Sequence, residues 1–438
     1  MGLSQRSRRL APLALLGAAG VALSGCGAPG ESTGDGGGDG ETATVTIYGT
    51  IVDSEAELLQ ESWADFEEEN NIDIQYEGSQ DFETQLGTRA QGGNPPDIAI
   101  FPQPGLFADF AARGYLKEAP EAVEANANEY WTEDWVEYGT YDGTFYGAPL
   151  MASVKGWIWY SPTQFAEWGV EVPTTLEELN TLTASIQEQT GSAPWCAGFE
   201  SGTATGWPGT DWIEDYVLRQ SGPDVYDQWV AGEVDFTDDR IKSAFDAVGE
   251  ILINPDYVNA GFGDVRSINS TAFGDVAPAL ANGECALTHQ ASFLSGFFPE
   301  GTNVAEDGDV WAFMLPGETA GETTVTGGGE IVGAFSDDEA TQKVLEYLSS
   351  PEWANNRVSL GGVTSANNGL DPENAQDPIL QETIKILQDP DTTFRFDASD
   401  LMPGAVGSGS FWSGMVSWIN GTGTDQVLQQ IQADWPDS

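Results

Sequence analysis

Apolar and polar positions along this chain follow a regular succession of strand and helix patterns. Residues 44–48 are all β-branched or aromatic, which predicts a first strand. A helix is expected next, because Ser54 and Glu57 have the spacing of a capping box. Four apolar residues fall on one face of that helix: Ala56, Leu59, Trp63 and Phe66.

The same rhythm continues for the next fifty residues. Residues 72–76 alternate as a strand, residues 81–91 have the pattern of a helix, and residues 97–101 that of a buried strand. A further short helix is predicted over residues 106–111 and ends before Gly114. This βαβαβα order is typical of a mostly parallel sheet covered by helices on both faces.

A second block repeats this order after a long apolar segment. Helices are predicted over residues 173–186, 207–220 and 240–253, and strands over residues 193–199 and 285–288. The chain has about 400 residues after the linker described below. This is more than one hydrophobic core normally accommodates, so two lobes are expected. The apolar segment 146–160 lies between the blocks and is predicted to cross from one lobe to the other.

The N-terminal segment has the pattern of a bacterial lipoprotein signal. Arg6, Arg8 and Arg9 precede an apolar run, residues 10–23, that is too short to span a bilayer. The segment ends in Leu-Ser-Gly-Cys, so Cys26 is expected to be lipidated and to become the mature N-terminus at the extracytoplasmic face of the cell membrane. An ordinary signal peptide that happens to contain this cysteine is the alternative. Residues 27–41, rich in glycine and acidic residues, are predicted to form a flexible linker.

The charge balance excludes two classes of partner. The chain has 70 acidic and 15 basic residues, a formal net charge of −55. Nucleic acid and anionic lipid surfaces would be repelled by such a protein. The acidic residues are dispersed along the chain, which indicates a solvated acidic surface of the kind found in salt-tolerant hosts.

The remaining cysteines predict a disulfide and give no sign of a metal site. Cys196 and Cys285 each begin a short apolar run, and these runs are expected to be neighbouring strands. Outside the cytoplasm the two thiols are expected to pair, although two separate buried thiols stay open as the alternative. His289 is the single histidine and has no partner at metal-ligand spacing, so neither a metal nor a cofactor is expected.

Two motifs and two longer runs give the chain a family resemblance. The motifs are Tyr-Gly-Ala-Pro at residues 146–149 and Pro-Thr-Thr-Leu-Glu-Glu-Leu at residues 173–179. The chain resembles the sugar-binding family of ABC-transporter solute-binding proteins, to which maltose-binding protein belongs. Residues 194–212 and 401–412 are similar to the α-glucoside-binding branch of that family.

The resemblance implies an α/β, two-lobed periplasmic-binding-protein fold of type II. Lobe one would comprise residues 42–151 and 327–368, and lobe two residues 152–326 and 369–438. The crossings between them would lie near residues 150–154, 326–331 and 369–372. The implied function is capture of a small carbohydrate, an α-glucoside of the maltose, sucrose or trehalose type, by a monomer that delivers it to ABC permease subunits.

Two tryptophans are the strongest candidates for the binding site, because pyranose rings stack on flat aromatic faces. Trp412 matches a sugar-stacking tryptophan of the family, with packing against a helix as the alternative. Trp207 stands before a proline among glycines, where a loop position in a cleft is expected. Near Trp412, Ser408 lies between two glycines that would let main-chain amides approach a ligand.

The polar candidates come from segments next to predicted strands. Lys155 on the crossing segment is expected either to pair with an acid or to reach a ligand. Asp397 is expected to bind a hydroxyl or to pair with Arg395, and Asp81 to bind ligand or to cap a helix. The remaining candidates follow strands: Gln80, Gln103, His289 and Gln290. The chain departs from maltose-binding protein at Gly105 and Leu106, where that protein has charged residues, so the hydroxyl pattern it reads is expected to differ.

The rival function is that of an extracellular glycoside hydrolase acting on α-glucosides. Such an enzyme needs two carboxylates at a fixed separation, but with 70 acidic residues their abundance does not indicate a pair. The chain has no eightfold strand–helix repeat and no Gly-x-Ser-x-Gly motif. A structural surface lipoprotein is a third possibility, but it would not need an aromatic cleft.

We expect salt to stabilise the folded protein. Removal of the signal leaves 12 basic residues against 70 acidic ones, a formal charge of −58, and counter-ions relieve the cost of compacting like charges. Raising NaCl from low to molar concentration should therefore increase the Tm by many degrees in a thermal unfolding experiment. A Tm that does not change with salt would contradict this interpretation.

Overall fold

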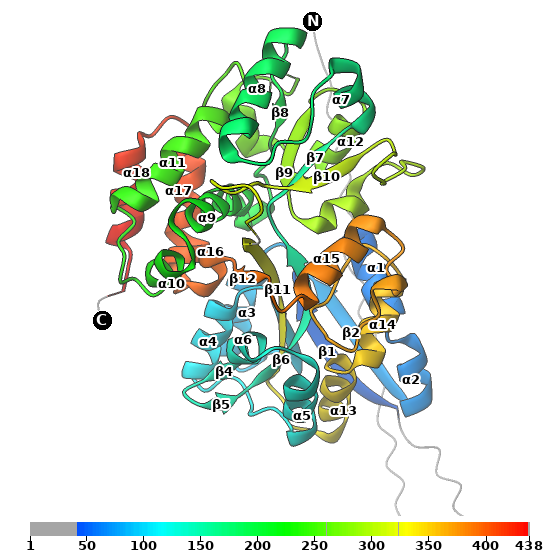
Figure 1. Ribbon diagram of the computed structural model, residues 1–438. Helices are drawn as coiled ribbons and strands as arrows, with labels where there is room; N and C mark the ends of the chain where they lie inside the picture. The colour runs from blue at the N-terminus through cyan, green and yellow to red at the C-terminus, as the bar shows by residue number, and fades with distance from the viewer. Residues whose placement is uncertain (1–41, 260, 323, 437–438) are drawn as a thin grey trace, which may run out of the picture. The chain divides into compact units, whose positions relative to one another are not determined.

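The computed structural model describes residues 42–259, 261–322 and 324–436, and contains two main sheets (Figure 1). Within these residues, one sheet has six strands in the order β12-β11-β3-β1-β2, with β6 also paired to β11. Its strands are β1 (Ala43–Gly49), β2 (Ile72–Gly78), β3 (Ile98–Phe101), β6 (Gly147–Val154), β11 (Thr324–Ala334) and β12 (Thr393–Phe396). The four-stranded sheet, β10-β7-β9-β8, consists of β7 (Trp157–Tyr160), β8 (Trp195–Cys196), β9 (Leu287–Gln290) and β10 (Trp311–Met314). A separate hairpin pairs β4 (Thr140–Tyr141) with β5 (Thr144–Phe145).

Both sheets are mixed. In the six-stranded sheet β1 is parallel to β2 and β3, while β11 runs antiparallel to β3 and β6. In the four-stranded sheet β7 is antiparallel to both of its neighbours, and only β8 and β9 are parallel. The expectation of mostly parallel sheets is wrong in this respect, because hydrophobic periodicity identifies a strand but not its direction.

Helices pack their apolar faces against both sheets. The six-stranded sheet is packed by α2, α4, α5, α6 and α13, and α9 also reaches β11. In Figure 1 this sheet occupies the lower half of the view, and α17 and α18 lie beside α11 at the upper left. Six helices come before the strands of the second sheet in the chain: α1 (Asp53–Glu61), α2 (Ala64–Asn70), α3 (Phe82–Gln91), α4 (Pro104–Ala112), α5 (Glu121–Tyr130) and α6 (Glu133–Tyr138). Two later helices also pack on the first sheet: α13 (Glu339–Leu348) and α14 (Pro351–Ser359). The others are α7 (Pro162–Trp168), α8 (Leu176–Thr190), α9 (Trp207–Ser221), α10 (Pro223–Val230), α11 (Asp239–Leu252), α12 (Val276–Ala281), α15 (Pro378–Gln388), α16 (Ala398–Leu401), α17 (Trp412–Ile419) and α18 (Thr424–Ala433).

The first predicted helix is divided into α1 and α2. Its predicted apolar face is correct, since Leu59 and Trp63 are buried. The expected capping box does not form: Val52 occupies the N-cap position without a side-chain hydrogen bond, and the next residue, Asp53, has φ of +55°. The periodicity of the apolar residues does not reveal this positive φ angle at the first residue of the helix. The first residues of α1 line the cavity described below.

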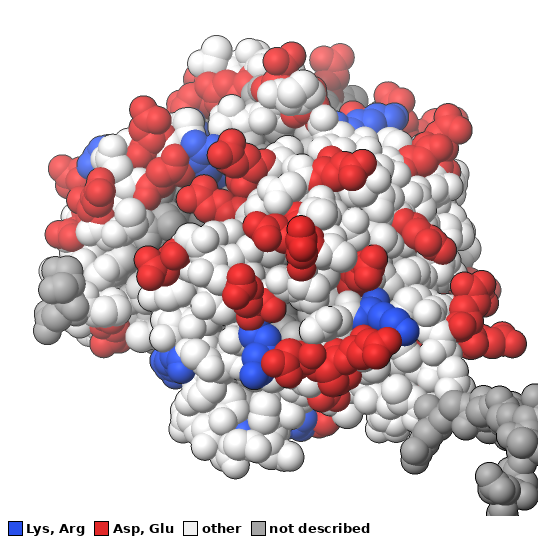
Figure 2. Space-filling model, turned by 90° about the horizontal axis from the view of Figure 1, so that it is seen from below, with Lys and Arg blue, Asp and Glu red and all other residues white. Residues whose placement is uncertain are grey.

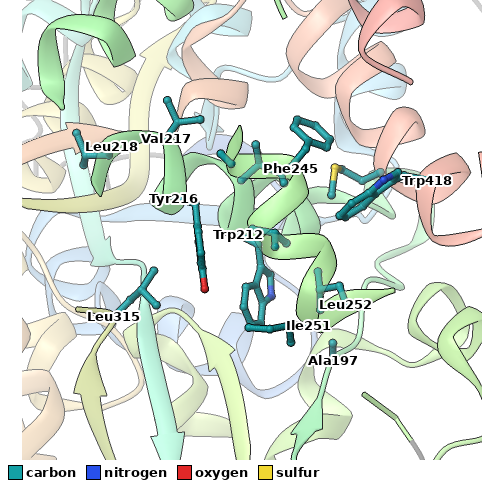
Figure 3. Close-up of a cluster of buried hydrophobic side chains, with 14 of the residues drawn as sticks. Ala197, Trp212, Tyr216, Val217, Leu218, Phe245, Ile251, Leu252, Leu315 and Trp418 are labelled. Carbon is teal, nitrogen blue, oxygen red and sulfur yellow. The ribbon is translucent and has the colours of Figure 1, made fainter. Parts of the chain in front are cut away.

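Helix α9 is the central helix of the larger hydrophobic core. All of its residues from Pro208 to Arg219 are buried, so this helix has no solvent-facing side. One face contributes Trp212, Tyr216 and Val217 to a cluster that also contains side chains of α11 and α17 (Figure 3). Asp211, Asp215 and Arg219 form an adjoining stripe of charged side chains, which places ionic groups in the interior between the two sheets.

Strand β12 belongs to the six-stranded sheet. It pairs in parallel with Thr324–Gly327, the first residues of β11, and the allocation from the family resemblance put residues 369–438 and most of this part of β11 in the same lobe, lobe two. The chain then leaves this sheet directly after Phe396 and enters α16, which packs against α9 and α10.

Acidic side chains outnumber basic ones on the face shown in Figure 2. The red side chains are scattered over much of that face, with few Lys or Arg among them. This distribution agrees with the dispersed acidic residues of the sequence. Among the described residues, none of the helices is both long and apolar enough to cross a bilayer.

Cys196 and Cys285 form a disulfide at the edge of the four-stranded sheet, with their Cα atoms 5.7 Å apart. Cys196 lies in β8, and Cys285 precedes β9, the parallel neighbour of β8. This is the pairing that the sequence analysis favoured over two separate thiols. Both residues are buried beside Trp157 and Trp159 in one apolar cluster.

We expect the intact mass of the non-reduced protein to be lower than that of the reduced protein by two hydrogens. The double variant Cys196→Ala/Cys285→Ala should lose about 2–5 kcal/mol of unfolding free energy in urea, as native disulfides commonly contribute. The control is wild-type protein unfolded in the presence of a reductant, and its free energy of unfolding should approach that of the double variant. Two free thiols in the unfolded, non-reduced protein would contradict the assignment.

Candidate ligand-binding site

A cavity of about 590 Å³ lies where β6 and β11 of the six-stranded sheet approach α9 and the segment before β10. Its volume is in the range of small-molecule sites in proteins. The lining comes from parts of the chain far apart in sequence, including Thr50–Glu55, Met151–Ser153, Ala272–Asp275 and Gly328–Glu330. Thr50–Glu55 follow β1 and Met151–Ser153 lie near the end of β6, and strand ends are where open α/β sheets place ligand sites.

One wall of the cavity is aromatic. It consists of Trp207, Phe273, Phe293, Phe297 and Trp412. The ring centroid of Trp207 lies 5.2 Å from that of Phe273 and 6.1 Å from that of Phe293. The indole Nε1 of Trp412 is buried without a hydrogen-bond partner in the protein. This wall therefore offers flat faces for stacking and a free N–H donor.

A glycine holds the two tryptophans next to each other. Gly206 has φ of +118° and is the residue from which α9 begins. A Cβ atom at this position would collide with the main chain of Trp412, so only glycine permits this approach. The contact brings the start of α9 against the start of α17 and sets the positions of Trp207 and Trp412.

Lys155 lies at the base of the aromatic wall and is held by two carboxylates. Its Nζ donates to both oxygens of Asp211 at 2.9 Å and to Oδ2 of Asp397 at 2.7 Å. Although burial disfavours the charged ammonium, these two carboxylates raise the pKa of Lys155. The ammonium also lies 4.6 Å from the centre of the Trp207 ring, a cation–π distance. Two roles were expected for Lys155, and the structure shows the ion pairs with acidic residues.

A second buried ionic group lies deeper, behind Lys155. Arg219 donates to Oδ1 of Asp215 at 2.7 Å, and Nε2 of His289 lies 2.6 Å from Oδ2 of the same residue. The hydroxyl of Thr326 in β11 also donates to Asp215. Burial would raise the pKa of Asp215, but Arg219 and His289 lower it to about 2. This group connects α9, β9 and β11 and does not line the cavity.

Carboxylates also line the cavity. Glu330 projects from β11 where the pairing with β6 shifts register between Gly329 and Ile331, and such bulges redirect side chains. Burial and then the charge of Glu55 raise the pKa of Glu330 to about 7, against the opposite effects of Arg357 and Lys155. Burial likewise raises the pKa of Glu83, whose Oε1 accepts from the Gln103 amide at 3.0 Å.

Several polar atoms at the cavity lack partners in the protein. Oε1 of Gln103 and Oδ1 of Asp397 are buried without a hydrogen bond, as is Nε1 of Trp412. Buried polar groups without partners are costly, so these atoms are positioned to bond to a ligand or to water. Burial and the nearby Asp397 also raise the pKa of Asp400, another lining residue.

Six of the ten predicted ligand-binding residues line the cavity: Gln80, Gln103, Lys155, Trp207, Asp397 and Trp412. Asp397 does not pair with Arg395, which binds Asp227 instead, at 2.6 Å. Cys26, predicted to be lipidated, lies outside the described residues.

The structure does not bring the other four into the lining. Asp81 is exposed at the start of α3 and makes no side-chain cap bond. His289 is turned towards Asp215 and packs on Trp212 with ring centroids 4.5 Å apart. The side chain of Gln290 accepts from the next main-chain N–H, and the hydroxyl of Ser408 donates back to Gly404 within a π-helical turn.

Sequence reasoning identified Asp397 but missed the other acidic lining residues and the charged stripe of α9. Glu330 could have been noticed, because three consecutive glycines precede it in a strand, a pattern that suggests a bulge. Trp207, Asp211, Asp215 and Arg219 recur at intervals of four along α9, which marks a polar stripe on a buried helix. Glu55 and Glu83 have no comparable signal among 70 acidic residues.

Three buried carboxylates, those of Asp211, Glu214 and Asp397, lie close enough to share a cation, with ligand atoms within 4.8 Å of one another. However, both oxygens of Asp211 and one oxygen of Asp397 already accept from Lys155. The ammonium therefore serves as the positive charge of this cluster.

Comparison with known proteins identifies the family. The sequence profile described as "Bacterial extracellular solute-binding protein" matches residues 52–355. The osmoprotective compounds-binding protein GgtB of Synechocystis sp. is 38% identical over 420 residues, which cover 95% of this chain and 97% of that protein. The alpha-glucosides-binding periplasmic protein AglE of Rhizobium meliloti is 36% identical, over 90% of this chain and 87% of that protein.

A solved structure supports the fold. The bacterial solute receptor AcbH, described as having an exclusive preference for β-D-galactopyranose, aligns with a TM-score of 0.75 at 18% identity, over 90% of this chain and 98% of its own. The α/β periplasmic-binding-protein fold expected from the sequence is confirmed, with mixed sheets. The glycoside hydrolase alternative is wrong, because the profile and both relatives are those of binding proteins. This chain belongs to the bacterial extracellular solute-binding protein family.

Proposed function

We propose that this protein is a lipid-anchored, extracytoplasmic component of an ABC transporter that captures a small α-glucoside and delivers it to the permease. The observation that carries the proposal is that aromatic side chains and carboxylates line the same cavity. Aromatic faces stack on the C–H-rich faces of pyranose rings, and carboxylates accept hydrogen bonds from hydroxyls.

The two curated relatives narrow the ligand class. One is named for osmoprotective compounds and the other for alpha-glucosides, and each aligns with nearly the whole chain. An uncharged disaccharide of the maltose, sucrose or trehalose type fits both names. A cavity of about 590 Å³ is large enough for a ligand of this size.

Binding would involve closure of two lobes, each built around one of the sheets. The segments joining them would be the end of β6, the start of β11 and the exit from β12, which lie side by side. A hydrogen bond of 2.8 Å from the Thr203 hydroxyl to the Gln80 carbonyl joins the segment before α9 to the segment after β2. Only the closed form would dock productively on the permease.

We expect Trp412→Ala to weaken sugar binding at least tenfold without unfolding the protein. Loss of a buried aromatic contact costs about 2–4 kcal/mol by analogy with interface hot spots, and micromolar binding corresponds to about −8 kcal/mol. Isothermal titration calorimetry against maltose, sucrose, trehalose, amino acids and peptides would measure it. Trp168→Ala is the matched control, because Trp168 is a partly buried tryptophan outside the cavity lining and should leave the affinity unchanged.

Two results would overturn this assignment. If an oligopeptide gives heat and no saccharide does, the ligand class is wrong. If Trp412→Ala binds sugar as tightly as the wild type, the site has been placed wrongly.

The proposed anchor is tested separately. Radiolabelled palmitate should be incorporated into the wild-type protein and not into Cys26→Ser, which should be released into the medium. Equal labelling of both proteins would rule out Cys26 as the lipidated residue.

A further inference from the structure

We propose that the cavity selects its ligand by charge: beside its carboxylates it accepts an uncharged polyol group, cyclic or open, and rejects a carboxylate of the same size. This inference rests on the proposed function and specifies which α-glucosides the site admits. The inference rests on two observations. Most charged groups of the described lining are carboxylates, and the described lining has no cation that is free to bind an anion.

Carboxylates are the prevailing charged groups of the lining. They are Asp53, Glu55, Glu83, Asp275, Glu330, Asp397 and Asp400. Among the described lining residues, the one cationic side chain is that of Lys155. Its ammonium is already bound to Asp211 and Asp397 at 2.7–2.9 Å, so it carries no uncompensated charge towards a ligand.

Another cation, Arg357, lies outside the lining. Arg357 is fully buried, and its Nη1 donates to the Gly361 carbonyl at 2.9 Å. Its charge acts on Glu55 and Glu330, which do line the cavity. One buried guanidinium is thus shared by two lining carboxylates and is not accessible to a ligand.

Hydrogen-bond chemistry favours a neutral ligand for a second reason. Ionised carboxylates accept hydrogen bonds and have none to donate. A hydroxymethyl group can donate to them, whereas a carboxylate in the same place offers a further acceptor and a further negative charge. Both effects act in a recess where water is partly excluded and charges are less screened than on the surface.

The test uses two α-glucosides that differ in one group. Maltitol and maltobionate share a glucosyl unit and an open six-carbon chain, but maltobionate ends in a carboxylate where maltitol ends in CH₂OH. Calorimetry at pH 8 should give a Kd for maltitol at least tenfold lower than for maltobionate. The ratio should persist in 1 M NaCl, because a surface field would be screened at that concentration.

A variant and a control locate the effect in the cavity. Glu330→Gln keeps the shape of the side chain and removes one charge of the lining, so it should reduce the maltobionate-to-maltitol Kd ratio severalfold. Glu121→Gln removes an exposed charge of α5 outside the cavity and should leave the ratio unchanged. Circular dichroism would verify that both variants are folded.

The pH dependence provides an independent check. Glu330 has a pKa raised to about 7, so it is largely neutral at pH 6 and ionised at pH 8. The groups whose charges act on it are Glu55, Arg357, Lys155, Tyr76 and Asp400. The Kd ratio should therefore increase from pH 6 to pH 8 in the wild type and change less in Glu330→Gln.

The outcomes separate this inference from the proposed function. Equal affinity for maltitol and maltobionate would overturn the charge selection while leaving sugar binding intact. Binding of maltose, sucrose or trehalose without binding of maltitol would also overturn it, since neutrality would then not suffice. If maltitol, maltobionate, maltose, sucrose and trehalose all fail to bind, the proposed function is wrong and the inference is wrong with it.

Discussion

The ion pairs of Lys155 are the interaction on which the site depends. They join three separate parts of the chain: the end of β6, the first turns of α9, and the segment between β12 and α16. Burying a charge is expensive, and removing one partner of a buried pair commonly costs about 3–5 kcal/mol because the other charge remains. The ammonium therefore requires both carboxylates to stay in place, and Trp207, one turn before Asp211, is positioned with them.

Helix α9 makes these buried charges possible. All of its residues from Pro208 to Arg219 are buried, and Trp212 and Tyr216 hold it in the large core, so its charged side chains cannot reach water. These side chains must then find partners inside, and they do so in two groups, one around Lys155 and one around Asp215. The deeper group stabilises the strands and the shallower one forms the base of the cavity.

The sequence predicted the elements better than the side-chain directions. Strands β1, β2 and β3 and helices α3, α9 and α11 lie where periodicity placed them, because their apolar faces are buried. Trp207 and Trp412 line the cavity as expected. His289 does not, because neighbouring residues of a strand face opposite sides, and the side occupied by His289 is set by its pairing with β7 and by Asp215. A tertiary partner of this kind leaves no local pattern in the sequence.

The position of β11 in the chain constrains when the protein can fold. This strand pairs with β3, β6 and β12, yet it begins only at Thr324, more than two hundred residues after the end of β3. Contacts of such long sequence separation form slowly, because a large loop must close before they give any stabilisation. The six-stranded sheet cannot be completed until most of the chain is present. Because β12 ends only at Phe396, a chain emerging on the far side of a membrane would remain incompletely folded until about nine tenths of it had passed, which would keep it in a form that a narrow pore can thread.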